Sequence, residues 1–196
     1  MTAGRLRAAL ESTPHWAWLE EALAEPGRIA RSFAAAGRRT SRAPLPGTPG
    51  WTTDEAARAL LLAALPPGRR ADAAGELYRH GDADEKRAVL KALPLLDAGA
   101  EAVPLLLDAI RTNDARLLAA ALGPPAAHLD QPAWRQAVLK CVFTGVPLAA
   151  VDRLDERADG ELAAMLAAFA AERAAAGRPT PSDAAALLRR LTSEET

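Results

Sequence analysis

The sequence is poor in the features that mark several large classes of protein. Only one of its 196 residues, Cys141, is a cysteine, which excludes an internal disulfide and a metal site built from clustered cysteines. Aromatic residues make up 4%, and 24 basic against 25 acidic residues leave a formal net charge of -1. A chain with so little net charge has no overall field that would attract nucleic acid or an anionic membrane surface.

Long apolar segments are also missing. The beginning, MTAGRLRAALESTPHW, has no apolar core typical of a signal peptide, and no apolar run reaches the roughly 18 residues of a membrane-spanning helix. His15, His80 and His128 lack the spacing of a helical metal-binding pair, and no glycine-rich phosphate loop occurs. We therefore expect a soluble, cytoplasmic protein with no metal, no cofactor, no nucleic acid partner and no stable membrane insertion.

What the chain has in abundance is helix-forming residues. Alanine supplies a quarter of the sequence, leucine and arginine are frequent, and isoleucine occurs only as Ile29 and Ile110. Alanine, leucine and arginine lose little side-chain freedom in a helix, and no segment alternates apolar and polar residues over the length of a strand. The composition predicts an all-α fold.

Capping residues divide the chain into about ten helices. Asp82 and Glu85 have the spacing of a capping box at the start of one helix, and Gly81 stands where the preceding helix is expected to end in a left-handed residue. Asn113 is expected to cap a helix that follows it, and Asp130 to open the helix that carries Trp134 and ends at Gly145. Gly177 is expected to end the long helix from about Arg157 to Ala176.

Helices of 10–15 residues with short connections predict stacked antiparallel hairpins. The sequence shows no strict internal period, so we expect an irregular α-α superhelix, similar to stacked HEAT-like hairpins, rather than a regular repeat array. The predicted organisation is an N-terminal helical hairpin (1–38) packed on the body, a Pro/Gly-rich loop (39–52), a helical domain (53–192) and a tail (193–196).

The segment from Arg28 to Arg42 is strongly basic, with no acidic residue between Pro26 and Thr53. One interpretation is a solvated face whose charge complements a helix C-terminus. The other is an anion site, in which guanidinium groups bind phosphate or carboxylate. The residues that would form this anion site are Arg31, Arg38 and Arg39.

The long C-terminal helix carries a cation on its apolar side. Leu162, Leu166 and Phe169 form a stripe, and Arg173 occupies the position where leucine would continue it. A half-buried arginine needs carboxylate or carbonyl partners, because an unpaired one would cost several kcal/mol. A network that ties this helix to its neighbours and a ligand site both satisfy that requirement.

A lysine occurs in the same way on the helix Pro132–Phe143, which is apolar over most of its circumference. Lys140 either reaches past the apolar surface to solvent or projects into a cavity, where a desolvated amine could act as a base or nucleophile. Arg111 and Asn113 form a polar helix junction earlier in the chain, and Cys141 is expected to be a small buried side chain.

Several of these segments resemble the EboA family. The resemblance extends from about Thr53 to Leu191 and is carried by ELYRHGDADEKRAVLKALPLL, DAIRTN, WRQAVLKCVFTGVPL, LDERADGELAAML and AAERAAAGRPTPSD, in that order; RIARSFAAAGRR is a weaker echo. It implies a bacterial protein encoded in a small gene cluster that makes or moves a secreted metabolite. Its partners would be other proteins of that cluster, and it implies no catalytic residue.

The family's motif residues correspond here to Gly81, Asp82, Arg111, Thr112, Asn113, Lys140, Phe143, Arg157, Glu161, Glu172, Arg173, Gly177 and Arg178. The chain departs from the family at Gly123–Ala126, at Asp159 where asparagine is usual, and at Phe169–Ala171 where a further aromatic residue is expected. If these positions line a ligand cavity, we expect this member to bind a different ligand or none.

Three functions follow as alternatives. The preferred one is a non-catalytic accessory protein that binds an anionic or prenylated intermediate; the second is a helical scaffold that binds a partner enzyme; the third is a lyase or isomerase that uses Lys140 or Glu172. For the first we expect seven residues to converge between the helices of Trp134 and Leu162: Arg111, Asn113, Lys140, Arg157, Glu161, Glu172 and Arg173.

Overall fold

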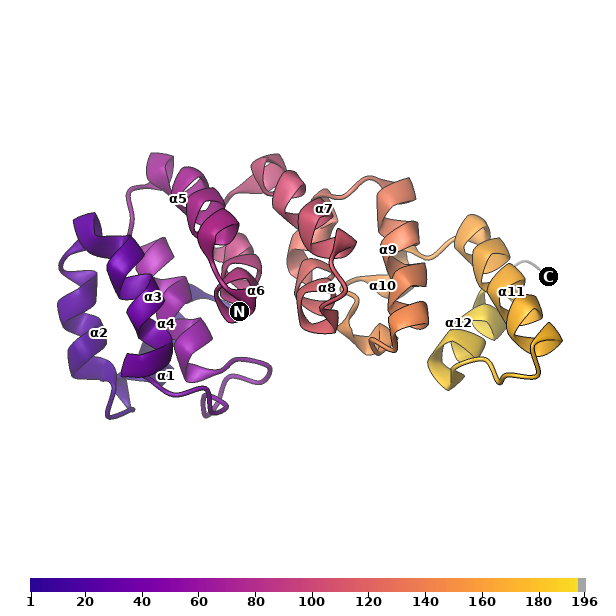
Figure 1. The fold of residues 1–196 in the computed structure, drawn as a ribbon, viewed down its shortest axis with the longest axis horizontal. Coiled ribbons are helices and arrows are strands. Elements are labelled where there is room, and N and C mark those ends of the chain that lie inside the picture. The colour runs from indigo at the N-terminus through magenta and orange to yellow at the C-terminus, as the bar shows by residue number, and fades with distance from the viewer. Residues whose placement is uncertain (194–196) are drawn as a thin grey trace. The chain divides into compact units, whose positions relative to one another are not determined.

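A computed structural model describes residues 1–193, and within that range every regular element is helical (Figure 1). The only strand-like pairing there is an isolated bridge between Pro44 and Thr52. The all-α prediction is therefore confirmed. None of the helices in this part of the chain is long and apolar enough to cross a membrane. The part of the predicted tail beyond Ser193 lies outside the described residues.

The chain forms two compact units, residues 1–107 and 108–196, and the division falls inside α7 (Val103–Arg111). Unit 1 contains α1 (Ala3–Glu11), α2 (Trp16–Leu23), α3 (Ile29–Arg39), α4 (Thr53–Ala63), α5 (Pro67–His80) and α6 (Ala83–Ala92), with the short 3-10 helices η1 (Pro26–Arg28), η2 (Leu93–Leu95) and η3 (Gly99–Ala102). The predicted boundaries at the 39–52 loop, and the predicted superhelix, remain predictions.

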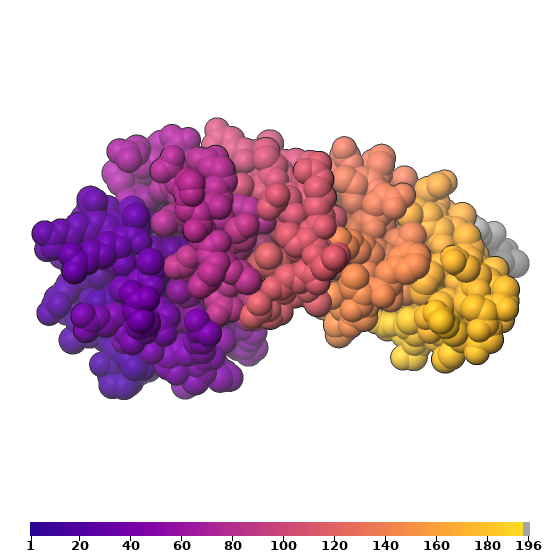
Figure 2. Space-filling view, in the orientation of Figure 1, coloured from indigo at the N-terminus to yellow at the C-terminus, as the bar shows by residue number. Residues whose placement is uncertain are grey.

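Unit 1 is built around α4. Helices α1, α2, α3, α5 and α6 all pack against it, so every residue from Thr53 to Leu62 is buried. Leucines from these neighbours fill the core together with Phe33 and Tyr78. On the face drawn in Figure 2, the indigo atoms of the N-terminal helices adjoin the purple atoms that follow them in the chain.

Unit 2 is built around α9 (Gln131–Thr144), which packs against α8 (Ala115–Ala121) and α11 (Gly160–Ala175). Helix α12 (Ser182–Ser193) packs on α11, and η4 (Pro124–His128), η5 (Leu148–Ala150) and α10 (Leu154–Arg157) connect the longer helices. The predicted apolar stripe of α11 is buried. Phe143 differs, because its side chain is 61% exposed and meets the edge of Phe169.

The capping predictions are confirmed where an aspartate accepts a hydrogen bond from a backbone N–H group in the first turn of the helix that it precedes. Asp82 and Glu85 form the capping box of α6, and Asp130 caps α9. Asn113 does not cap α8, because Asp114 accepts the hydrogen bond from the Arg116 amide instead. The long C-terminal helix begins at Gly160 rather than near Arg157, since Asp159 caps it.

The prediction of a left-handed Gly81 is wrong, since its φ of -78° is open to any residue. Glycine fits for a different reason. A Cβ atom at this position would lie 2.6 Å from the Leu77 carbonyl oxygen and 2.9 Å from Glu85 Cβ. The turn between α5 and α6 is therefore too close to its own backbone for any side chain.

Replacing Gly81 by alanine should thus lower the free energy of unfolding by about 1–3 kcal/mol, because neighbouring backbone must move. Gly75 provides the matched control, since a Cβ there meets only the Arg79 Nη1 atom at 3.8 Å. Gly75→Ala should raise stability by up to about 1 kcal/mol, the helix preference of alanine over glycine. Urea denaturation of both variants measures the difference, and equal effects would contradict this account of the turn.

Candidate functional site

Three of the four predicted cations of unit 2, Lys140, Arg157 and Arg173, bind the protein's own backbone. The Lys140 ammonium group donates to the carbonyl oxygens of Ile110 (2.6 Å) and Thr112 (2.8 Å), at the end of α7. Arg173 donates twice to the Pro179 carbonyl oxygen, at 3.1 and 2.8 Å, and its guanidinium lies 5.9 Å from the Phe169 ring centre. The expectation that Arg173 needs carboxylate or carbonyl partners is confirmed.

Arg157 is held in the same way. It donates to the carbonyl oxygens of Ala126 (2.7 Å) and Leu129 (3.0 Å) and to the side-chain oxygen of Gln131, and it covers the buried Trp134 ring at 4.7 Å. Burial lowers the pKa of Arg157 from its ordinary value. This arginine therefore fastens α10 to η4 and to the start of α9.

The contacts of Arg157 are given above, and the other six predicted residues lie at three positions. Arg111 and Asn113, both exposed, flank the carbonyl groups that bind Lys140. Glu161 is exposed in the first turn of α11; the hydrogen bond to Asp159 is the main cause of the raised pKa of Arg135, and the charge of Glu161 adds to it. Glu172 is exposed beside Arg173 near the other end of α11. The contacts join neighbours in pairs and do not bring all seven together, so a shared ligand site at these residues remains a prediction.

Asp159, one of the departures from the family pattern, is the centre of a network that the sequence analysis missed. Its carboxylate accepts hydrogen bonds from Arg135, Gln131 and the Leu162 amide, and so both caps α11 and joins it to α9. The hydrogen bond from Arg135 is the main reason that the pKa of Asp159 falls from 3.8 to about 2. An asparagine could cap the helix but could not form this ion pair.

Because the pKa of Asp159 is lower in the folded state, its contribution to stability is present above pH 3.8 and is lost as the pH falls from 3.8 towards 2. The free energy of unfolding should therefore decrease with falling pH over this window. In Asp159→Asn the free energy of unfolding should depend less on pH between 3.8 and 2, and its pH dependence outside this window should be unchanged. Urea denaturation at several pH values measures the slope; identical slopes for both proteins would contradict the assignment.

The sequence analysis also missed a cluster of charges around α4. Arg58, only 2% exposed, donates to Asp54 at 2.6 Å and to the Phe33 carbonyl oxygen at 3.1 Å. Glu55, 3% exposed, pairs with Arg87 at 3.0 Å and with Lys91. We call Asp54, Glu55, Arg58, Arg87 and Lys91 the α4 ion cluster.

The α4 ion cluster fixes the 39–52 loop. Lys91 donates to the Gly50 carbonyl oxygen at 2.6 Å and lies 4.5 Å from the centre of the Trp51 ring. Burial lowers the pKa of Lys91, while Glu55 acts in the opposite direction. The one signal in the sequence is the spacing of Asp54 and Arg58, four residues apart in an otherwise apolar helix.

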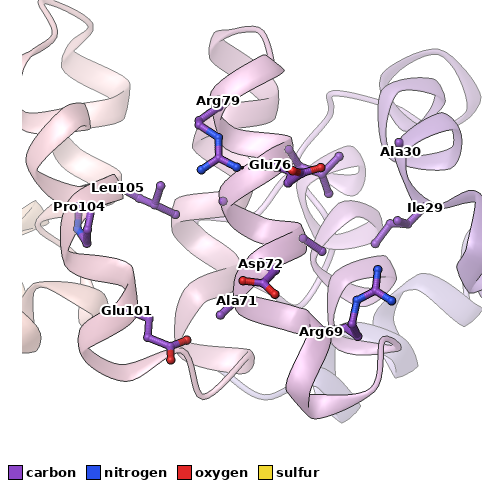
Figure 3. A pocket seen from close by; sticks show the side chains of 13 residues that line it. Ile29, Ala30, Arg69, Ala71, Asp72, Glu76, Arg79, Glu101, Pro104 and Leu105 are labelled. Carbon is purple, nitrogen blue, oxygen red and sulfur yellow. Dashed lines mark ion pairs between the residues drawn. The ribbon is translucent and has the colours of Figure 1, made fainter.

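An open groove of about 720 Å³ runs along α5 in unit 1. We call it the α5 groove. Ile29 and Ala30 form one wall, and Pro104 and Leu105 form the other, with residues of α5 between them (Figure 3). Charges of both signs line it: Arg69, Asp72, Glu76, Arg79 and Glu101.

The charges of the α5 groove are only partly neutralised. Arg79 and Glu76 form an exposed ion pair at 3.6 Å. Arg69, Asp72 and Glu101 have no ion pair or side-chain hydrogen bond within residues 1–193. Glu101 lies on the α7 side and Arg69 on the Ile29 side, with Asp72 between them on α5 (Figure 3). The groove therefore offers unpaired charges of opposite sign on its two sides.

A smaller pocket of about 320 Å³ lies between α2 and α3, and Arg31 and Arg39 of the predicted anion site line it. Arg38 does not line this pocket, although it is exposed on the same helix. The structure therefore brings two of the three predicted arginines to one place. We call it the α2–α3 pocket.

Comparison with known families gives one result. The model of a family described as metabolite traffic protein EboA matches residues 34–188. No curated protein and no solved structure matches the chain. The matched range includes nearly all of the α5 groove, apart from Ile29 and Ala30, and only two lining residues of the α2–α3 pocket, Ala35 and Arg39.

Proposed function

The chain belongs to the EboA family of metabolite traffic proteins, and from this premise we propose that it is a non-catalytic adaptor that binds a partner protein in its α5 groove. The partner would be another protein of the same ebo-type gene cluster, one that makes or moves the metabolite. This proposal corresponds to the alternative of a helical scaffold that binds a partner enzyme, and it names the α5 groove as the binding surface.

The observation that carries the proposal is the mixed lining of the groove. Sites for small molecules are mostly apolar hollows with a few polar groups that converge on the ligand. The α5 groove is open, and its unpaired charges of opposite sign stand on opposite sides of an apolar and small-residue centre. Protein interfaces have this pattern, with an apolar middle and charges at the rim that select the partner.

An amphipathic helix of the partner fits these dimensions. The floor is formed partly by small residues of α5, among them Ala71, Ala73 and Gly75. A Cβ added at Gly75 would meet only the tip of Arg79, so the space above the helix is open. Small residues let two helix backbones approach closely, and an α-helix with side chains is about 10–12 Å across. The groove volume of about 720 Å³ suits the buried half of about two helical turns.

The charges specify the sequence of that helix. Basic residues on one of its edges and towards its middle would pair with Glu101 and Asp72, and an acidic residue on the other edge would pair with Arg69. Apolar residues between them would cover Ile29, Leu105 and the small residues of α5. Complementary rim charges chiefly increase the association rate and exclude wrong partners.

Binding of an anionic or prenylated intermediate at the seven predicted residues is supported less well. Lys140, Arg157 and Arg173 already bind backbone carbonyl groups, so a ligand would have to displace those contacts. The side-chain nitrogen of Lys140 donates to two backbone carbonyl groups, so a lyase or isomerase that used it as a base or nucleophile would first have to break both contacts.

The test uses the full chain and the purified proteins encoded beside it. One of them should bind in calorimetry, and reversing both acidic charges (Asp72→Arg with Glu101→Arg) should weaken binding about 10- to 100-fold. Glu11→Arg, an exposed charge reversal on α1 outside the groove, is the matched control and should have little effect. Absence of any binding partner, or equal loss in the control, would overturn the proposal.

A further inference from the structure

The α2–α3 pocket has a cationic and an apolar part, and we propose that it binds a small organic anion whose phosphate or carboxylate group meets Arg31. The ligand's apolar part would lie against Trp18. This proposal does not depend on partner binding in the α5 groove, which lies elsewhere in unit 1.

One face of α3 carries the polar groups of the pocket. Arg28, the N-cap of α3, lies three and four residues before Arg31 and Ser32, and Ala35 lies four residues after Arg31 and four before Arg39, so these residues share one face. The small Ala35 in the middle leaves room for a ligand between Arg31 and Arg39. Eight residues separate these two arginines, about 12 Å along the helix. Their guanidinium groups therefore meet different parts of an elongated molecule rather than one phosphate.

The charge balance leaves two arginines available. Arg28 forms an ion pair with Glu25 at 2.9 Å, and both belong to the pocket. Neither Arg31 nor Arg39 has an ion pair or a side-chain hydrogen bond within the described part of the chain. Glu21 supplies the remaining negative charge of the lining. With Arg28 and Glu25 cancelling, the pocket keeps a net positive charge that favours an anion.

The apolar side comes from α2. Trp18 and Ala22 face the pocket, and the indole of Trp18 is only partly buried, so part of it remains open to contact. An isoprenoid or aromatic group on this surface would remove apolar area from water. The Ser32 hydroxyl adds a hydrogen-bond donor one residue from Arg31. The combination favours phosphate or carboxylate esters and acids with an apolar group over inorganic anions.

Calorimetry with the full chain tests this, using geranyl phosphate, phenyl phosphate and inorganic phosphate as probes. The two organic phosphates should bind about tenfold or more tightly than inorganic phosphate, and Arg31→Gln should weaken them by about tenfold, whereas Arg39→Gln, about 12 Å further along α3, should weaken them less. Trp18→Gln should remove the preference for organic phosphates. Arg38→Gln, the same charge change on the same helix outside the pocket, should leave the affinity unchanged.

Three outcomes would overturn the proposal. The first is that none of the probes binds at millimolar concentration. The second is that Arg38→Gln weakens binding as much as Arg31→Gln, which would mean attraction to a basic surface alone. The third is that the protein binds vesicles of phosphatidic acid but not the soluble phosphate esters. Circular dichroism of each variant shows whether α2 and α3 still fold, and Arg31→Lys, which keeps the charge but not the planar fork, should retain part of the affinity.

Discussion

Arg58→Ala should lower the free energy of unfolding by about 3–5 kcal/mol, the largest effect that we expect from any single ion pair of the protein. The Asp54 carboxylate is 2% exposed and would stay buried with its cation removed. The substitution also takes away the donor to the Phe33 carbonyl oxygen and the cation above the Phe33 ring. Urea denaturation followed by circular dichroism measures the loss.

Two further variants distinguish the cost of leaving a buried charge unpaired from the loss of an ion pair as such. Replacing both partners, Arg58→Met with Asp54→Leu, should restore much of the stability, because apolar residues of similar volume can substitute for a buried ion pair. Arg28→Ala breaks an exposed pair of similar length with Glu25, and it should change the stability little. A loss in Arg58→Ala no larger than in Arg28→Ala would show that the α4 ion cluster is solvated.

Trp134→Ala should cost about 3–5 kcal/mol, the usual loss for a large aromatic side chain of a core. Trp134 is fully buried at the centre of unit 2, and its ring supports Arg157, which connects η4 with the start of α9. Both the packing and the surface beneath the guanidinium disappear in the variant. Thermal or urea unfolding gives the value.

Trp134→Phe is the informative comparison. The indole Nε1 atom is buried and has no hydrogen-bond partner within residues 1–193, so the native structure carries an unsatisfied donor. Phenylalanine removes that donor and keeps an aromatic face under Arg157, although it leaves a small cavity. Its cost should be well below that of Trp134→Ala. Equal costs would mean that the N–H group has a partner in solution, such as a bound water molecule.

Local sequence signals predicted the helices well because their causes are local. Asp82 with Glu85, and Asp130 and Gly145 at the two ends of α9, act on backbone groups within four residues. Gly81 shows where such reasoning fails. A glycine at a helix end suggested a left-handed residue, whereas the actual constraint is the close approach of the Leu77 carbonyl oxygen.

The roles of the charged residues could not be predicted in the same way. Lys140 and Arg157 bind carbonyl oxygens 26 or more residues away in the sequence, and no side chain in the sequence marks such acceptors. The same limit hid the pairing of Glu55 with Lys91, 36 residues apart. A cation on an apolar helix correctly indicated a negative partner, but the sequence could not distinguish a ligand from a distant backbone group.

The buried thiol of α9 has a practical consequence. Cys141 is the single cysteine of the chain and is fully buried, and burial raises its pKa to about 12. Reagents that attack thiolates can therefore modify it only when the surrounding helices separate. The rate at which Cys141 is alkylated in native buffer therefore reports how often unit 2 opens, and mass spectrometry can measure it without any engineered label.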